Sequence, residues 1–185
     1  AARAKVQQLQ TELNALSKKH ALRPPLASVQ TESFEPVLAQ SVRMKIAATA
    51  NGAPASIYEF EAWTPQKQNA ALATTGAVPS ASSFALANQT RHFENLTDGS
   101  VDRRQSFPWV SASGGPAWFR IDFPKPVTLQ SITWHNGSSV PADYVIEVLR
   151  PDDVWLPVAH TRDRLPRTDD QRAPATVKLT GLDAE

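Results

Sequence analysis

The stretch WFRIDFPKPVTLQSITW at Trp118–Trp134, followed by DYVIEVLRPDDVWLPVA at Asp143–Ala159, decides the fold class. Both stretches place aromatic or aliphatic side chains at every second position over several residues. Because successive side chains of a strand point to opposite faces of a sheet, this period of two predicts half-buried strands. Prolines and glycine punctuate the runs. The pattern therefore predicts an all-β protein built as an antiparallel sandwich.

Three successive strands are expected within these stretches, the first two of them inside Trp118–Trp134. Along the second strand, Leu129 is out of phase with Ile132, and a bulge near Gln130–Ser131 would bring both side chains to the same face. We expect three of the tryptophans to lie in the core: Trp118, Trp134 and Trp155.

An earlier segment, residues 42–63, is expected to form a hairpin. Val42, Met44 and Ile46 alternate with basic residues, and IYEFEAW at Ile57–Trp63 is the expected return strand. Asn51-Gly52 between them is a sequence typical of a tight hairpin turn. The small residues from Asn69 onwards predict an edge strand, residues 160–174 predict a long surface loop, and Val177 with Leu179 predicts one last strand.

The first 23 residues are expected to form a separate helical arm. Val6, Leu9, Leu13 and Leu16 follow three- and four-residue steps, as in a coiled coil, and Pro24 ends the helix. Two interpretations remain open: coiled-coil contact with a partner through residues 1–22, or a helix whose leucines lie on the sandwich. Residues 24–41 are expected to be a linker, and residues 42–185 the sandwich.

Composition excludes several classes of function. Nineteen basic against eighteen acidic residues give a net charge of +1, too balanced for a dedicated nucleic-acid binder. With no cysteine, the chain has no disulfide, thiolate metal site or cysteine nucleophile. No apolar run is long enough to span a membrane. The chain starts on Ala-Ala-Arg, which suggests a fragment of a larger protein, whose compartment the missing signal peptide does not reveal.

Four motifs in order carry a family resemblance. ENLTDGS at Glu94–Ser100, then Trp109, then the two strand-forming stretches quoted above, resemble the discoidin or F5/8 type C domain. The resemblance covers about half of the chain, from Asn69 to Ala159. It implies a galactose-binding-like jelly-roll sandwich, a fold common among bacterial carbohydrate-binding modules.

The order of the segments departs from that family. The closing strand is missing from the C-terminal end, whereas residues 42–63 resemble the family's closing hairpin, placed first. We therefore expect a circular permutation, which surface termini tolerate well. A further departure is RPDDVW at Arg150–Trp155, where Asp152-Asp153 must make a turn usually made by glycine. Similar regions occur in large exported bacterial proteins with c-type haem domains, so export as part of a larger protein is expected; this chain binds no such haem itself.

The resemblance implies a structural calcium ion near the LTDGS loop. Its expected ligands are the carboxylates of Asp98 and Glu59, the carbonyl of Tyr58 and a further contribution from Asp102. Calcium takes six to eight oxygen ligands, which loop carbonyls and two or three carboxylates supply. The alternative is an Asp-Gly turn with solvated carboxylates.

The resemblance also implies a ligand site on the loops at one end of the sandwich. Sugar recognition uses an aromatic face and Arg, Asn or His donors, and Arg103-Arg104 suits an anionic polysaccharide. The alternative for Trp109 is a place in the core, and for His135 a hydrogen-bonded loop position. The candidate contacts are Arg103, Arg104, Trp109, His92, His135, Asn136, Arg162 and Trp63.

No enzyme motif is present, and the acidic residues of one loop are better explained by calcium than by glycoside cleavage. The sequence thus predicts a non-catalytic carbohydrate-binding module that tethers a larger exported protein to a polysaccharide. The alternative is a structural or protein-interaction module without a glycan ligand. Binding to acidic phospholipid would require exposed apolar loop tips, for which the candidates are Phe84, Leu86 and Phe107.

Overall fold

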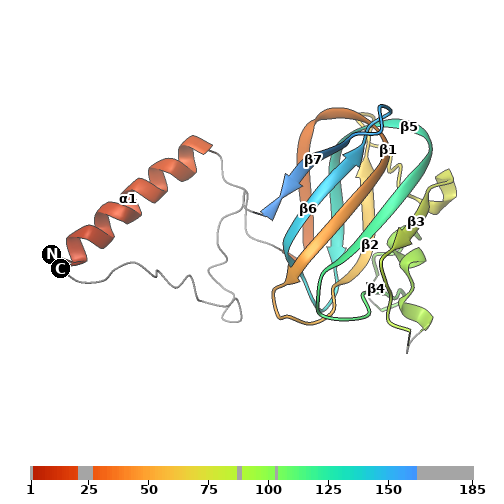
Figure 1. Ribbon diagram of the computed structural model, residues 1–185, viewed down its shortest axis with the longest axis horizontal. Coiled ribbons are helices and arrows are strands. Elements are labelled where there is room, and N and C mark those ends of the chain that lie inside the picture. Colours follow the sequence, from red (N-terminus) through yellow and green to blue (C-terminus); the bar gives the residue numbers. More distant parts are fainter. Residues whose placement is uncertain (1, 21–26, 87–88, 103, 162–185) are drawn as a thin grey trace.

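The computed structural model describes residues 2–20, 27–86, 89–102 and 104–161, which form an antiparallel sheet preceded by one helix (Figure 1). The strands are β1 (Val29–Thr49), β2 (Ser56–Trp63), β3 (Val78–Ala81), β4 (Trp109–Val110), β5 (Ala117–Asn136), β6 (Pro141–Leu149) and β7 (Trp155–His160). The helix α1 (Ala2–His20) and the short 3₁₀ helices η1 (Ala73–Thr75), η2 (Gln89–Arg91) and η3 (Phe93–Leu96) complete the described elements. The all-β prediction is confirmed.

Two long strands, β1 and β5, run through the whole sheet. The strand order is β4-β2-β5-β1-β6-β7, and β3 pairs with the first half of β5. Both long strands bend where their pairing register shifts, between Ala39 and Ser41 and again between Ser33 and Val37 of β1. Pro124 and Pro126 lie in the first of these irregular segments, where no ladder hydrogen bond is required of them. Each long strand therefore serves two layers, which gives a sandwich-like molecule whose arching strands are visible in Figure 1.

The core lies between these layers and follows the alternation in the sequence. Phe119, Ile121, Tyr144 and Ile146 are buried, as the period of two predicts. The change of phase between Leu129 and Ile132 is also confirmed, since both are fully buried. The bulge was expected in β5, near Gln130–Ser131. The extra residues lie instead in β1, where the pairing register shifts between Ser33 and Val37.

Three expectations about the strands are wrong. The residues of Trp118–Trp134 form a single strand rather than two. The turn at Gly52 exists, with φ of 69°, but β1 and β2 are not a hairpin, because β5 lies between them in the sheet. The chain crosses from one layer to the other at this turn. Circular permutation of the discoidin fold stays a prediction.

The third wrong expectation is the linker at residues 24–41. β1 begins at Val29, and the side chains that it buries there are Gln30 and Glu32 rather than apolar ones. The Tyr144 hydroxyl donates a hydrogen bond to Glu32 Oε1 at 2.7 Å inside the core. Because the buried face carries polar residues here, the sequence lacks the apolar alternation by which a strand is predicted.

Other turns and ends agree with the sequence. Asp153 adopts φ of 60° in the β6–β7 turn, so an aspartate does take the conformation usually given to glycine. The small-residue segment forms the edge strand β3. The predicted strand at Val177 and Leu179 and most of the loop at residues 160–174 lie outside the described residues.

The arm is helical, and its first apolar residues do not pack on the sheet. Val6 and Leu9 are exposed, and Figure 1 shows α1 standing apart from the strands. This removes support from the interpretation in which the helix lies on the sandwich. Within the part of the chain that is described, no helix combines the length and apolarity needed to cross a membrane.

Candidate functional site

The LTDGS loop and strand β2 bring two carboxylates together. A register shift between Ile57 and Glu59 bends β2, and a bulge of this kind re-aims a side chain. Glu59 is 1% exposed, and its Oε2 accepts a hydrogen bond from the Gly99 N–H at 3.1 Å. Gly99 has φ of 78°, and Asp98 Oδ1 accepts from the Ser100 N–H at 2.7 Å. The Asp-Gly turn thus holds its carboxylate beside that of Glu59.

The Glu59 carboxylate lacks compensation in this environment. The pKa of Glu59 is raised to about 9, mainly by burial. The Gly99 hydrogen bond lowers this pKa, whereas the charges of Asp98 and Glu61 and a side-chain hydrogen bond with Asp98 raise it. Glu59 Oε1 is buried and has no hydrogen-bond partner. An unpaired buried carboxylate is costly unless it is protonated or meets a cation. This donor set fits a hard cation with oxygen ligands.

The predicted calcium ligands are only partly assembled. Among the described residues, no three His, Asp or Glu side chains are grouped to hold a metal ion. Asp102 instead organises its own turn: its Oδ1 accepts from the Arg104 N–H at 2.9 Å, and its carbonyl accepts from Gln105 and Ser106. A cation here would therefore depend on Glu59, Asp98 and backbone carbonyls.

A pocket of about 380 Å³ adjoins this region, because it is lined by Tyr58, the residue before Glu59 in the chain. We call it the loop pocket. The turn built by Asp102 places Arg104 and Phe107 in its wall, and η2 supplies Arg91. Its lining residues are Ser56, Tyr58, Arg91, Arg104, Gln105, Ser106, Phe107, Pro108 and Ser138. Its volume lies in the range of small-ligand sites.

The lining combines the groups that sugar binding requires. Guanidinium groups are donors suited to carboxylate or sulfate oxygens, and aromatic rings such as those of Tyr58 and Phe107 have apolar faces. Phe107 is 54% exposed, which is unusual for a residue of its size. The Ser56 hydroxyl is buried and has no hydrogen-bond partner. Buried hydroxyls are normally paired. This one lies against Gly137 and is not accessible to a ligand.

Of the predicted sugar contacts, Arg104 lines the loop pocket, and two others are buried. Trp109 is fully buried, its Nε1 donates to the Ser83 carbonyl at 2.9 Å, and its ring meets Phe119 edge-on. Asn136 is also fully buried, and its Nδ2 donates to the Ala27 carbonyl at 2.7 Å. Neither side chain presents a surface to a ligand. The alternative of a core position for Trp109 is therefore confirmed.

The two predicted histidines are engaged elsewhere. The His92 ring stacks against Phe93 and meets Phe84 edge-on, with centroid distances of 3.9 and 4.5 Å. His135 Nε2 lies 3.6 Å from Glu61 Oε2, where β2 pairs with β5. Trp63 is half-buried at the far end of β2 and does not line the loop pocket. Arg103 and Arg162 lie outside the described residues.

Sequence reasoning missed Arg91, Ser56 and Ser138 and assigned Phe107 a different role. A 3₁₀ turn sends Arg91 to the pocket and its neighbour His92 into an aromatic cluster, which no sequence period signals. Of the proposed lipid contacts, Leu86 and Phe107 are exposed, whereas Phe84 packs against the core.

Comparison with known proteins identifies no relative: no family model, no curated protein and no solved structure matches this chain.

Proposed function

We propose that this chain is a non-catalytic carbohydrate-binding module whose loop pocket takes an acidic sugar of a polysaccharide. The observation that carries the proposal is the joint lining of one pocket by Arg91, Arg104, Tyr58 and Phe107. The arginines would bind a carboxylate or sulfate group, and the rings would cover the C–H face of the sugar. As a domain of a larger exported protein, the module would hold that protein on its polysaccharide.

Calcium would complete this site. We propose that Glu59 and Asp98 hold the ion together with loop carbonyls, and that it fixes the LTDGS loop against β2. The buried and unpartnered Glu59 Oε1 supports the proposal. The ion would supply charge compensation and rigidity, while the ligand contacts belong to the arginines and rings. Neutralising Glu59 and Asp98 also leaves the neighbouring region more attractive to an anionic ligand.

Affinity electrophoresis tests the function directly. Wild-type protein is run through gels that contain polygalacturonate or heparin, beside Arg91→Ala, Arg104→Ala and the matched control Arg150→Ala. Arg150 lies outside the loop pocket and is exposed, so its removal changes net charge equally. We expect retardation of the wild type, at least a fivefold weaker apparent affinity in Arg91→Ala and Arg104→Ala, and no change in Arg150→Ala.

Two outcomes would overturn the proposal. The first is migration of the wild type unaffected by either polysaccharide, which would favour a structural or protein-interaction module. The second is an equal loss in all three variants, which would show diffuse attraction of charge rather than a site. Retardation that a chelator abolishes would additionally support the calcium ion.

A further inference from the structure

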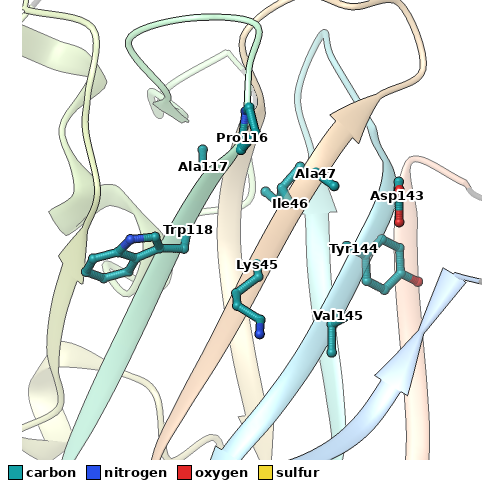
Figure 2. Close-up of a pocket in the computed structure, with 9 residues that line it drawn as sticks. All are labelled: Lys45, Ile46, Ala47, Pro116, Ala117, Trp118, Asp143, Tyr144 and Val145. Carbon is teal, nitrogen blue, oxygen red and sulfur yellow. The ribbon is translucent and has the colours of Figure 1, made fainter.

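A second hollow surface lies on the outer face of the sheet and involves none of the loop-pocket residues. Three cross-strand neighbours, Trp118 of β5, Lys45 of β1 and Val145 of β6, form a row across the strands. His160 of β7 continues the row beyond Val145. Figure 2 shows Trp118, Lys45 and Val145 on their neighbouring strands. We call this surface the sheet groove.

The groove is hollow because its centre holds a small residue. Ala47, exposed on β1, lies among Pro116, Trp118 and Asp143, and these residues line a cavity of about 330 Å³. A second cavity of about 330 Å³ shares Lys45, Asp143 and Val145 and extends to His160. The two cavities together span four strands, or three strand spacings of about 4.8 Å. A span of about 14 Å suits a short oligosaccharide better than a single sugar.

Trp118 gives the groove an aromatic wall. The sequence predicted this indole in the core, yet it is 41% exposed, on the same face as Arg120 and Lys45. Trp134, sixteen residues along the same strand, is fully buried. An indole held at the edge of a hollow, on a face that also carries Arg120 and Lys45, offers the flat apolar surface that a pyranose ring stacks on.

The charges around the groove are fixed and balanced. Glu147 accepts from Arg43 Nε at 2.6 Å and from Lys45 Nζ at 3.1 Å, and Arg43 lies over the Trp155 ring at 3.8 Å. Long side chains that are already held lose little freedom when they bind hydroxyl groups. Three cations of this face, Arg43, Lys45 and Arg120, are matched by the three anions Asp122, Asp143 and Glu147. The balance gives no preference for a charged ligand.

We infer that the sheet groove binds a neutral oligosaccharide chain laid across β5, β1, β6 and β7, stacked on Trp118 and hydrogen-bonded by Lys45, Asp143 and His160. This is a second glycan surface, separate from the loop pocket and different in ligand charge. One module would then hold a polysaccharide at two places: neutral sugars in the sheet groove and acidic sugars in the loop pocket. Two weak contacts would act together.

The test is affinity electrophoresis in gels that contain neutral polysaccharides: hydroxyethylcellulose, xylan, glucomannan, galactomannan, mixed-linkage β-glucan and dextran. Trp118→Ala removes the aromatic wall, and Ala47→Arg fills the hollow from an exposed position. Leu86→Ala and Ala73→Arg are the matched controls, since both residues are exposed and outside the groove. Circular dichroism melts establish that all four variants fold.

We expect at least one neutral polysaccharide to retard the wild type. The apparent affinity should be at least tenfold weaker in Trp118→Ala and Ala47→Arg. The two control variants should bind as tightly as the wild type. Arg104→Ala keeps this retardation, so failure of the loop pocket and failure of the groove are distinguishable. No retardation by any of the six polysaccharides, or equal retardation of Trp118→Ala, overturns the inference. So does a concentration-dependent dimer that Trp118→Ala abolishes, because the groove would then be an interface between copies.

Discussion

The loop end and the outer sheet face treat charge in opposite ways. At the loop end, Glu59 is buried beside Asp98 with one carboxylate oxygen unpartnered. On the sheet face, Glu147 is nearly as buried, yet it accepts from both Arg43 and Lys45. One region leaves a buried carboxylate oxygen without a partner, and the other pairs its carboxylate with two cations.

This difference teaches what each region can offer to a ligand. Uncompensated buried charge is costly, so a cation bound at the loop end would stabilise it. The sheet face has little to gain electrostatically and offers shape and an aromatic surface instead. We therefore expect the loop end to respond to ions, pH and acidic sugars, and the sheet face to respond to none of these.

The largest expected effect is on the free energy of unfolding, and it distinguishes a core tryptophan, Trp109, from Trp118 of the sheet groove. Trp109→Ala removes a fully buried ring that packs on Phe119, and this should lower the free energy of unfolding by about 3–5 kcal/mol. Trp118→Ala removes a ring that is 41% exposed and should cost less than about 1 kcal/mol. Urea denaturation measures both. Equal losses would contradict the division into a core and a ligand-facing tryptophan.

Calcium should stabilise the protein through the loop end. At one hundred times its dissociation constant, an ion that binds only the folded state adds about 2.7 kcal/mol, which corresponds to a rise in Tm of about 5–10 °C. Thermal melts in calcium and in chelator measure this rise. Glu59→Gln should abolish it, because the carboxylate is lost while the amide oxygen can still accept from Gly99. Glu61→Gln is the control and should keep most of it; an unchanged rise in Glu59→Gln would contradict the site.

The pH dependence of stability in chelator should carry the signature of Glu59. Its pKa in the folded state is about 9, above the ordinary value of 4.5, so between these values the unfolded state loses this proton first. Stability should therefore fall as pH rises from about 5.5 to about 8.5, by up to about 1.4 kcal/mol per pH unit. Comparing wild type with Glu59→Gln by urea denaturation isolates this slope. Identical slopes in the two proteins would show that Glu59 is ionised or paired.

The smallest expected effect concerns the compensated carboxylate of the sheet face. Glu147→Gln leaves Arg43 and Lys45 without their shared anion, but both cations are partly exposed and can be solvated. We expect a loss of about 1 kcal/mol in the free energy of unfolding. Adding calcium should not alter this loss. A calcium-dependent loss would show that the two regions are coupled.

The sequence predicted the elements of the fold better than their partners. The alternation around Phe119 and Tyr144 indicates which faces are buried, because burial depends on local period. That β5 separates β1 from β2 depends on long-range pairing, which no local pattern encodes. The first part of β1 was missed for a related reason, since it buries Gln30 and Glu32 and shows no apolar period.

For the candidate site, local turns can be predicted from the sequence, whereas contacts between distant segments cannot. The structure places the Asp98-Gly99 turn beside Glu59, whereas Asp102 organises its own turn, and the calcium ion stays a prediction. The loop pocket depends on residues from β2, η2 and two loops, so Arg91 and Ser56 could not be recognised from their neighbours in the chain. The exposure of Trp118 is consistent with the alternation that places Arg120 on the same face.

The most direct test of a module with two glycan surfaces is a chemical-shift titration of the isotope-labelled chain by NMR, in calcium. We predict that an oligogalacturonate shifts backbone amides of residues 56–58, 91 and 104–107. A neutral oligosaccharide, taken from the polysaccharide that retards the chain, should shift those of residues 45–47, 117–118 and 143–145 instead. Shifts confined to other residues, or no shifts with either ligand, would contradict the account.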